Sequence, residues 1–107
     1  MSFGGPFSPA MNDLVEAAYR SKVTVVAAAG NSAQDASLTS PASAPHAITI
    51  GATDITDTFA AFSNRGPLVD LLAPGVAIRG AYICNQACYA ISTGTSQGKC
   101  LCLPHPD

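Results

Sequence analysis

Apolar residues near the start of the chain recur three and four positions apart, which predicts an amphipathic helix. Ser8 is a good N-cap and Pro9 suits the first helical position, so the helix should begin there. Its apolar stripe consists of Met11, Leu14, Val15, Ala18 and Tyr19. We expect this stripe to cover one face of a sheet.

Two later runs predict strands that are buried on both faces. Residues 23–29 and 47–52 are β-branched or small throughout and lack strict polar alternation, as is typical of a parallel sheet. Phe3 ends what we interpret as an earlier strand, which Gly4 and the residues after it break. Strand, helix and strand in this order favour an α/β fold with a crossover connection. Residues 32–45 are rich in Ser, Ala and Pro and predict a long loop.

Turn residues crowd the second half of the chain. Between them, residues 59–62, 69–72 and 76–78 predict short strands or connectors. No apolar run approaches the roughly 20 residues needed to span a bilayer.

The composition resembles the interior of a larger fold. The chain has 107 residues, of which 48% are hydrophobic and 11% charged, whereas about a quarter of an ordinary domain is charged. The net charge of −2 gives no electrostatic reason to expect nucleic acid as a partner. Met1 leads directly into Ser-Phe-Gly-Gly, so no signal peptide is recognisable in this chain.

The four cysteines form two close pairs in sequence. Cys84 and Cys88 are followed by Cys100 and Cys102 with no nearby pair of histidines, which is a poor zinc pattern. We expect a disulfide between Cys84 and Cys88, which implies an oxidising compartment. The pairing of Cys100 and Cys102 stays open.

Gly94-Thr95-Ser96 is the short motif with the clearest chemistry. A serine framed by small residues can sit on a sharp turn, and glycine permits the close approach of a substrate carbonyl. If a helix begins directly after Ser96, its free N–H groups face an oxyanion that forms beside the serine. The same three residues also suit an ordinary loop.

Several motifs in one order resemble the subtilisin-like serine peptidases, in particular the proteinase K group. The motifs are SFGG at 2–5, AAGN at 28–31, SPASAP at 40–45, ITIGA at 48–52, FSNRG at 62–66, DLLAPG at 70–75 and GTS at 94–96. The resemblance covers residues 1–97 and implies the central-to-C-terminal part of a subtilase catalytic domain. It implies a partial three-layer α/β fold with a mostly parallel sheet and a flanking helix. Residues 98–107 form an unmatched tail that we expect to be disordered.

The resemblance also implies roles for single residues. Ser96 would be the nucleophile, and the Asn31 amide would donate to the oxyanion together with the Ser96 N–H. The residues that would bind the peptide are Ser2, Phe3 and Gly4, pairing as an added strand, and Ala28, Ala29 and Gly30, lining the pocket for the side chain before the cut bond. From the residues alone, Asn31 also suits a plain turn, and the two segments suit a strand edge and a tight turn.

A structural calcium ion follows from the same resemblance, whereas catalysis needs no cofactor. Its ligands would be the carbonyls of Pro45 and Ala47 and the carboxylate of Asp70, with water completing the oxygen shell. Asp70 could instead be a strand-terminal residue that accepts hydrogen bonds from backbone N–H groups.

Two expected parts of such an enzyme are missing from the sequence. The family takes its general base, a histidine, and the aspartate that orients it from sequence before Ser2, and after Ser96 it continues into a long buried helix. Here Gly98 and two prolines follow, which should prevent a helix of several turns. His46 and His105 match no catalytic position.

We therefore expect a fragment of a secreted subtilisin-like serine endopeptidase that is inactive in isolation. Its partners would be a peptide or protein substrate and the N-terminal and C-terminal remainder of the same domain. Two alternatives stay open: a silent fragment that binds peptides or a protein partner, and a truncated product that does not fold alone.

Overall fold

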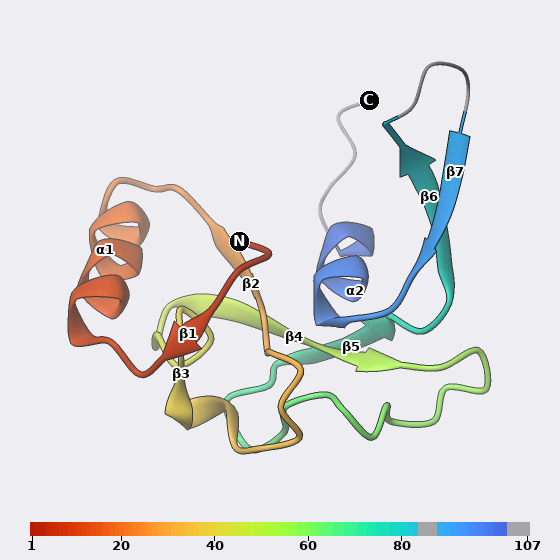
Figure 1. Ribbon diagram of the computed structural model, residues 1–107. Coiled ribbons are helices and arrows are strands. Elements are labelled where there is room, and N and C mark those ends of the chain that lie inside the picture. The colour runs from red at the N-terminus through yellow and green to blue at the C-terminus, as the bar shows by residue number, and fades with distance from the viewer. Residues whose placement is uncertain (84–87, 103–107) are drawn as a thin grey trace.

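The computed structural model describes residues 1–83 and 88–102 (Figure 1). In chain order its elements are β1 (Gly5–Pro6), α1 (Pro9–Arg20), β2 (Val25–Ala28), the 3-10 helix η1 (Ala36–Leu38), β3 (Thr39–Ser40), β4 (Ala47–Thr53), β5 (Leu71–Pro74), β6 (Ile78–Tyr82), β7 (Cys88–Ser92) and α2 (Thr95–Leu101). Parallel strands form the central sheet in the order β2-β4-β5. Two antiparallel pairs, β1 with β3 and β6 with β7, lie beside it.

Helix α1 begins where its capping residues predict. The Ser8 hydroxyl accepts a hydrogen bond from a first-turn N–H, and Pro9 occupies the first turn. The predicted apolar stripe was too wide, because Val15 is fully buried while Leu14 is 63% exposed and Tyr19 is 51% exposed. The contact surface consists mainly of small alanines around β2, so only the centre of the stripe reaches it.

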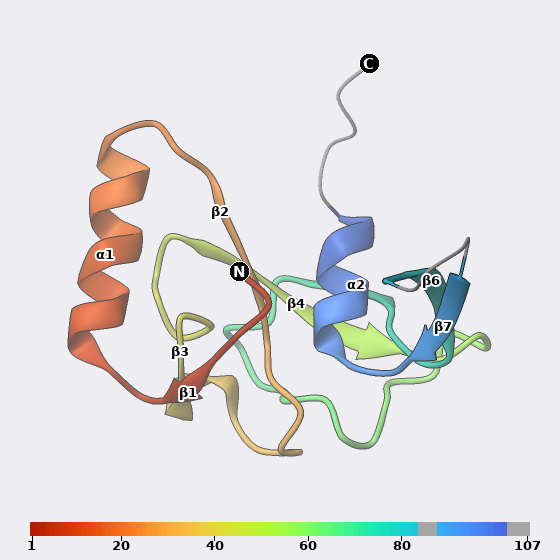
Figure 2. The ribbon, with the colours of Figure 1, turned by 45° about the horizontal axis from the view of Figure 1, so that its top comes forward.

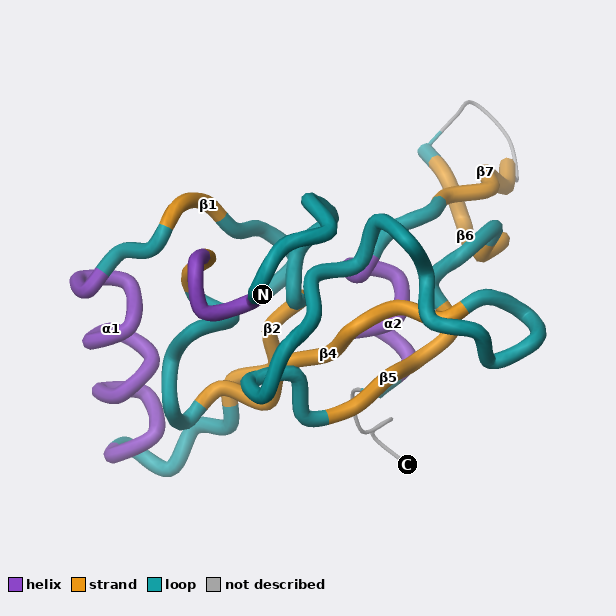
Figure 3. The backbone as a smooth tube through the Cα atoms, turned by 90° about the horizontal axis from the view of Figure 1, so that it is seen from below, coloured by secondary structure: helices purple, strands orange, loops and turns teal. Residues whose placement is uncertain are grey.

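The two helices pack on opposite faces of the parallel sheet. Val25 and Ala27 pack with Val15 of α1 on one face. Val26 and Ile50 belong to the cluster on the other face, which α2 covers. Figure 2 shows α1 and α2 on either side of β2, and in Figure 3 α2 lies behind β4 and β5. The α/β class predicted from the sequence is therefore confirmed, with a helix on each face.

Helix α2 approaches the sheet very closely. The Gly94 N–H donates to the Gly75 carbonyl at 2.8 Å, which holds the start of α2 beside the end of β5. A Cβ atom on Gly98 would lie 3.0 Å from the Ala73 carbonyl oxygen and 3.3 Å from the Gly51 carbonyl oxygen. Glycine at 98 thus lets the helix rest on the strands, and α2 continues through it to Leu101. The disorder expected from residue 98 onward is wrong for residues 98–101, while residues 103–107 lie outside the described part.

The N-terminal segment differs from its prediction. Phe3 belongs to no strand and is 58% exposed. Met1 instead lies along β2, since its amino group donates to the Val26 carbonyl and its carbonyl accepts from the Ala28 N–H at 3.0 Å. The long loop predicted at 32–45 contains η1 and β3, and β3 pairs with β1.

The antiparallel pair of β6 and β7 was not predicted, because neither strand has an alternating apolar pattern. Cys88 begins β7, while Cys84 lies outside the described residues, so their disulfide stays a prediction. Neither helix in residues 1–83 and 88–102 is long and apolar enough to cross a membrane.

Replacement of Val15 by alanine should lower the free energy of unfolding by about 2 kcal/mol, since it removes two buried methyl groups and leaves a cavity. Urea unfolding followed by circular dichroism measures the change. Leu14→Ala is the matched control on the same helix turn, and because Leu14 is exposed its effect should stay within about 0.5 kcal/mol. Equal losses for the two variants would contradict the burial described here.

Candidate active site

Asn31 and Thr95 meet at the carboxyl edge of the parallel sheet. The Thr95 N–H and the Thr95 hydroxyl both donate to Asn31 Oδ1, each at 2.9 Å. Thr95 is fully buried, and its hydroxyl oxygen also accepts the Gly30 N–H at 3.1 Å. With two donors on its oxygen, the Asn31 amide is held in one orientation, and its NH₂ group is left for a partner on the outer side.

Ser96 follows Thr95 in the first turn of α2 and is half-buried. Its hydroxyl donates to the Ser2 carbonyl at 3.1 Å. Three of the predicted site residues, Ser2, Asn31 and Ser96, are therefore close together although they come from widely separated parts of the chain. Their chemical roles stay predictions.

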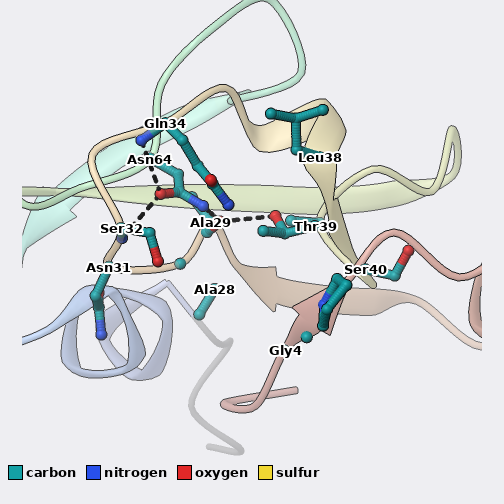
Figure 4. Close-up of a pocket in the computed structure, with 14 residues that line it drawn as sticks. Gly4, Ala28, Ala29, Asn31, Ser32, Gln34, Leu38, Thr39, Ser40 and Asn64 are labelled. Atoms are coloured by element: carbon teal, nitrogen blue, oxygen red, sulfur yellow. Dashed lines mark hydrogen bonds between the residues drawn. The ribbon is translucent and has the colours of Figure 1, made fainter.

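A hollow of about 500 Å³ opens beside Asn31 (Figure 4). Five residues of the predicted site line it: Gly4, Ala28, Ala29, Gly30 and Asn31. Ser2 and Phe3 lie outside its lining. Among the described residues that line the hollow none is an Asp, Glu, Lys or Arg, so its walls favour a neutral group.

The opposite wall comes from the segment that the sequence predicted only as a loop. Leu38, Thr39 and Ser40 line the hollow together with Ala28 of β2 and Ala29, which follows that strand. The Thr39 hydroxyl lies 3.3 Å from the Ala29 carbonyl and 3.0 Å from the Ala36 carbonyl, with both oxygens as acceptors. Residues 32–45 show no periodicity, so no signal in the sequence indicated this wall.

Asn64 is a second residue that the sequence reasoning missed. It is fully buried at the back of the hollow, and its side chain bonds the loop that follows β2 (Figure 4). The only available signal was its place in FSNRG at 62–66, a motif that carried the family resemblance without a role for the asparagine.

The carboxylate of Asp35 lies outside the lining of the hollow. Asp35 is exposed, and hydrogen bonds from the Ser37 hydroxyl and then the Ser37 N–H hold the pKa of the Asp35 carboxyl below its usual value. These bonds cap η1, which carries part of the far wall. The Asp35 carboxylate therefore stabilises the loop by capping η1 and does not face the hollow.

The family model described as "Subtilase family" matches residues 1–98. The chain belongs to the subtilase family. Among its relatives, the subtilisin-like proteinase Mp1 of Magnaporthiopsis poae is 56% identical over 97 residues, which are 90% of this chain and 24% of that protein. The cuticle-degrading serine protease of Arthrobotrys oligospora is 44% identical over 98% of this chain and 25% of its own length. This subtilase chain thus spans about a quarter of the length of these fungal relatives.

A solved structure agrees with this assignment. The crystal structure of a cold-adapted subtilisin-like serine proteinase matches 92% of the subtilase chain with a TM-score of 0.85 and 41% sequence identity. The match covers 36% of that proteinase. The partial subtilisin-like fold predicted from the sequence is therefore confirmed.

His46 lies apart from the subtilase site residues. Its ring stacks on Tyr19 of α1 with 3.9 Å between centroids, and its Nδ1 contacts the Glu16 carboxylate. Hydrogen bonds from Arg20 and then from His46 hold the pKa of the Glu16 carboxyl below its usual value. His46 thus joins the loop before β4 to α1, and His105 lies outside the described residues.

The three predicted calcium ligands lie near the amino ends of parallel strands β4 and β5, at the edge of the sheet opposite Ser96. Pro45 and Ala47 flank the start of β4, and Asp70 directly precedes β5. Asp70 Oδ2 accepts the Thr49 N–H at 2.7 Å, and the carboxylate remains exposed. Residues 1–83 and 88–102 hold no cluster of three His, Cys, Asp or Glu side chains. Backbone carbonyls plus one carboxylate form an all-oxygen set, which fits calcium.

Gly30→Ala should lower the free energy of unfolding by about 2 kcal/mol or more. Gly30 has φ +105°, and an added Cβ would lie 2.5 Å from Asn64 Nδ2. Thermal unfolding measures the loss. Gly80→Ala is the control, because a Cβ at Gly80 meets nothing within 4 Å, and it should be neutral to within about 0.5 kcal/mol. A neutral Gly30→Ala would show that the loop after β2 is not held as described.

Proposed function

We propose that this chain is the part of a serine endopeptidase domain that carries the nucleophile Ser96 and the oxyanion donor Asn31. The observation that supports this most directly is the bond pair from Thr95 to Asn31 Oδ1, which orients the amide beside the first turn that carries Ser96. A complete domain would hydrolyse peptide bonds in proteins.

In the proposed reaction the Ser96 Oγ attacks the carbonyl carbon of the peptide bond and gives its proton to a histidine from the remainder of the domain. The carbonyl oxygen becomes an oxyanion, which accepts from the Asn31 amide and the Ser96 N–H. Collapse of this intermediate breaks the C–N bond, and the amine leaves with the proton from the histidine. Water then releases the acyl group by the same steps in reverse.

The hollow beside Asn31 suggests the kind of residue before the cut bond. Its walls are small alanines and glycines with neutral polar groups, and its volume is about 500 Å³. An apolar or aromatic side chain would fill it with little cost in desolvation. Backbone pairing along Ser2 to Gly4 would hold the peptide without strong selection at other positions.

The isolated chain should not catalyse this reaction. In the described residues the Ser96 hydroxyl donates to the Ser2 carbonyl, and His46 packs against Tyr19 of α1. Without a base to take its proton, a serine hydroxyl is a poor nucleophile at neutral pH.

Activity can be tested in a chimera in which residues 1–98 replace the corresponding segment of the M. poae proteinase. We expect this chimera to cleave a chromogenic peptide with an apolar residue before the cut bond. Ser96→Ala should lower its kcat at least about 10⁴-fold. The 107-residue chain alone should show no cleavage. Activity of the chain alone that Ser96→Ala abolishes would overturn the inactivity, and a chimera that folds without activity would overturn the catalytic role.

A second candidate function is peptide binding without cleavage. The observation in its favour is that the hollow is formed entirely by described residues of this chain. Saturable binding of an apolar peptide by the isolated chain, weakened by Gly30→Ala, would support it. The proposed catalytic role does not require such binding.

We further propose that the complete protein acts outside the cell and holds a structural calcium ion at Pro45, Ala47 and Asp70. Bound calcium would link the segment before β4 to the segment before β5 and so stabilise the amino edge of the sheet. The all-oxygen donor set supports this proposal.

Asp70→Asn should weaken calcium binding at this site by at least about tenfold, because it removes the single negative charge among the ligands. The isosteric amide retains an oxygen that can accept from Thr49. Isothermal titration of the chimera should count one high-affinity calcium ion fewer than for Asp13→Asn, an exposed carboxylate on α1. Equal counts would exclude the site.

A further inference from the structure

We infer that Asn64 is a positioning residue for catalysis, which acts by fixing the backbone on both sides of Asn31. The inference rests on the proposed function, because it assigns a role through the oxyanion donor. Asn64 itself would touch neither the substrate carbonyl nor Ser96.

Asn64 bonds the residues immediately before and after Asn31. Its Oδ1 accepts the Ser32 N–H at 3.0 Å and the Gln34 N–H at 3.3 Å. Its own backbone N–H donates to the Gly30 carbonyl at 2.8 Å. Asn31 is therefore bracketed by two neighbours that both hold to one fully buried residue.

The side chain also reaches back to the strand that precedes the loop. Asn64 Nδ2 donates to the Ala29 carbonyl at 2.9 Å, and the dashed lines in Figure 4 show this side chain at the centre of the loop. Ala29 follows the end of β2, and although its N–H still donates to the Ile50 carbonyl of β4, its carbonyl needs a partner from outside the sheet. Asn64 supplies both an acceptor and a donor at that point.

Asn31 is held from two directions. Asn64 determines where the backbone at 31 lies, whereas Thr95 determines how the Asn31 amide is turned. Figure 4 shows the Asn31 side chain extending toward α2, away from Asn64. Loss of Asn64 would leave the bonds from Thr95 in place but release the backbone that carries them.

The amide is the side chain that meets these needs. An aspartate would keep the acceptor and lose the donor to the Ala29 carbonyl, and a leucine would fill the space with neither. The close approach of Gly30, where a Cβ would lie 2.5 Å from Asn64 Nδ2, leaves no room for a larger group. The arrangement thus needs a neutral donor and acceptor of this size.

A displaced oxyanion donor raises the free energy of the transition state more than that of the bound substrate, so it lowers kcat with little change in KM. This pattern distinguishes a positioning role from a general effect on stability. In the chimera described above, Asn64→Ala should lower kcat about 10- to 100-fold with KM changed less than about threefold. Asn12→Ala is the matched control. Asn12 also links two segments through its side chain, bonding Ser43 at 3.0 Å, and it lies away from the hollow. Its kcat should stay within about twofold of the parent.

A double-mutant cycle provides the decisive measurement. Asn31→Ala alone should lower kcat about 100- to 1000-fold, the range known for loss of this donor in another subtilase. If Asn64 acts through Asn31, adding Asn64→Ala to Asn31→Ala should lower kcat by less than about threefold more. Fully multiplied effects would overturn the inference while leaving the proposed function intact. Where Asn64→Ala does not fold, Asn64→Ser takes its place in the same cycle.

Amide hydrogen exchange of the full 107-residue chain gives a readout that needs no activity. The Ser32 and Gln34 amides should exchange at least about tenfold faster in Asn64→Ala than in the parent, while the Ile50 amide in β4 keeps its rate. Unchanged exchange at Ser32 and Gln34 would contradict the inference. If the folded chimera shows no Ser96-dependent cleavage at all, the proposed function fails, and the inference fails with it.

Discussion

One shared acceptor joins two segments of this molecule that are far apart in the sequence. Asn31 Oδ1 accepts from the N–H and the hydroxyl of Thr95, which lies 64 positions later in the chain. The bonds connect the loop after β2 to the first turn of α2, and the Thr95 hydroxyl oxygen returns to the Gly30 N–H. Since Ser96 is the next residue, its distance from Asn31 follows from this contact. Together with the packing of α2 on the sheet, the contact fixes how these two distant segments lie at the edge of the sheet.

The contact is possible because small residues let α2 lie almost on the strands. Gly98 rests against the carbonyls of Ala73 and Gly51, and Gly94 bonds the Gly75 carbonyl at the end of β5. A larger residue at 98 would lift the helix and carry Ser96 away from Asn31. Backbone packing at this distance therefore serves the geometry of the site as much as the stability of the fold.

The subtilase assignment gives these contacts a chemical meaning. In a serine peptidase the donors to the oxyanion must be in place before the reaction begins, because moving them during the reaction would cost part of the rate enhancement. Thr95 orients the Asn31 amide and Asn64 bonds the backbone on both sides of Asn31, so the donor that we propose would be held from two sides. The hollow lined by Ala28 and Ala29 lies beside it, where an adjacent side chain of a bound peptide would be held.

Features that depend on neighbours along the chain could be predicted from the residues. Ser8 caps α1 because a cap acts within one turn, and 47–52 forms β4 because its apolar run needs burial on both faces. The extent of burial on α1 could not be predicted, since it depends on whether another segment packs over Leu14, and none of the described residues buries it. Gly98 and the prolines were expected to prevent a helix of several turns, and α2 has seven residues. The local penalty of about 1 kcal/mol for Gly98 relative to alanine does not keep this short helix from lying against the sheet.

The candidate site likewise contains residues that the sequence indicated and residues that only the folded structure revealed. The motifs around Asn31 and Ser96 named both residues, because a family pattern preserves residue types in order along the chain. Asn64 was overlooked, and so was the wall made by Leu38 and Thr39, because their partners are distant in sequence. Hydrogen bonds across 30 or more positions leave no local pattern, and only the folded chain brings their donors and acceptors together.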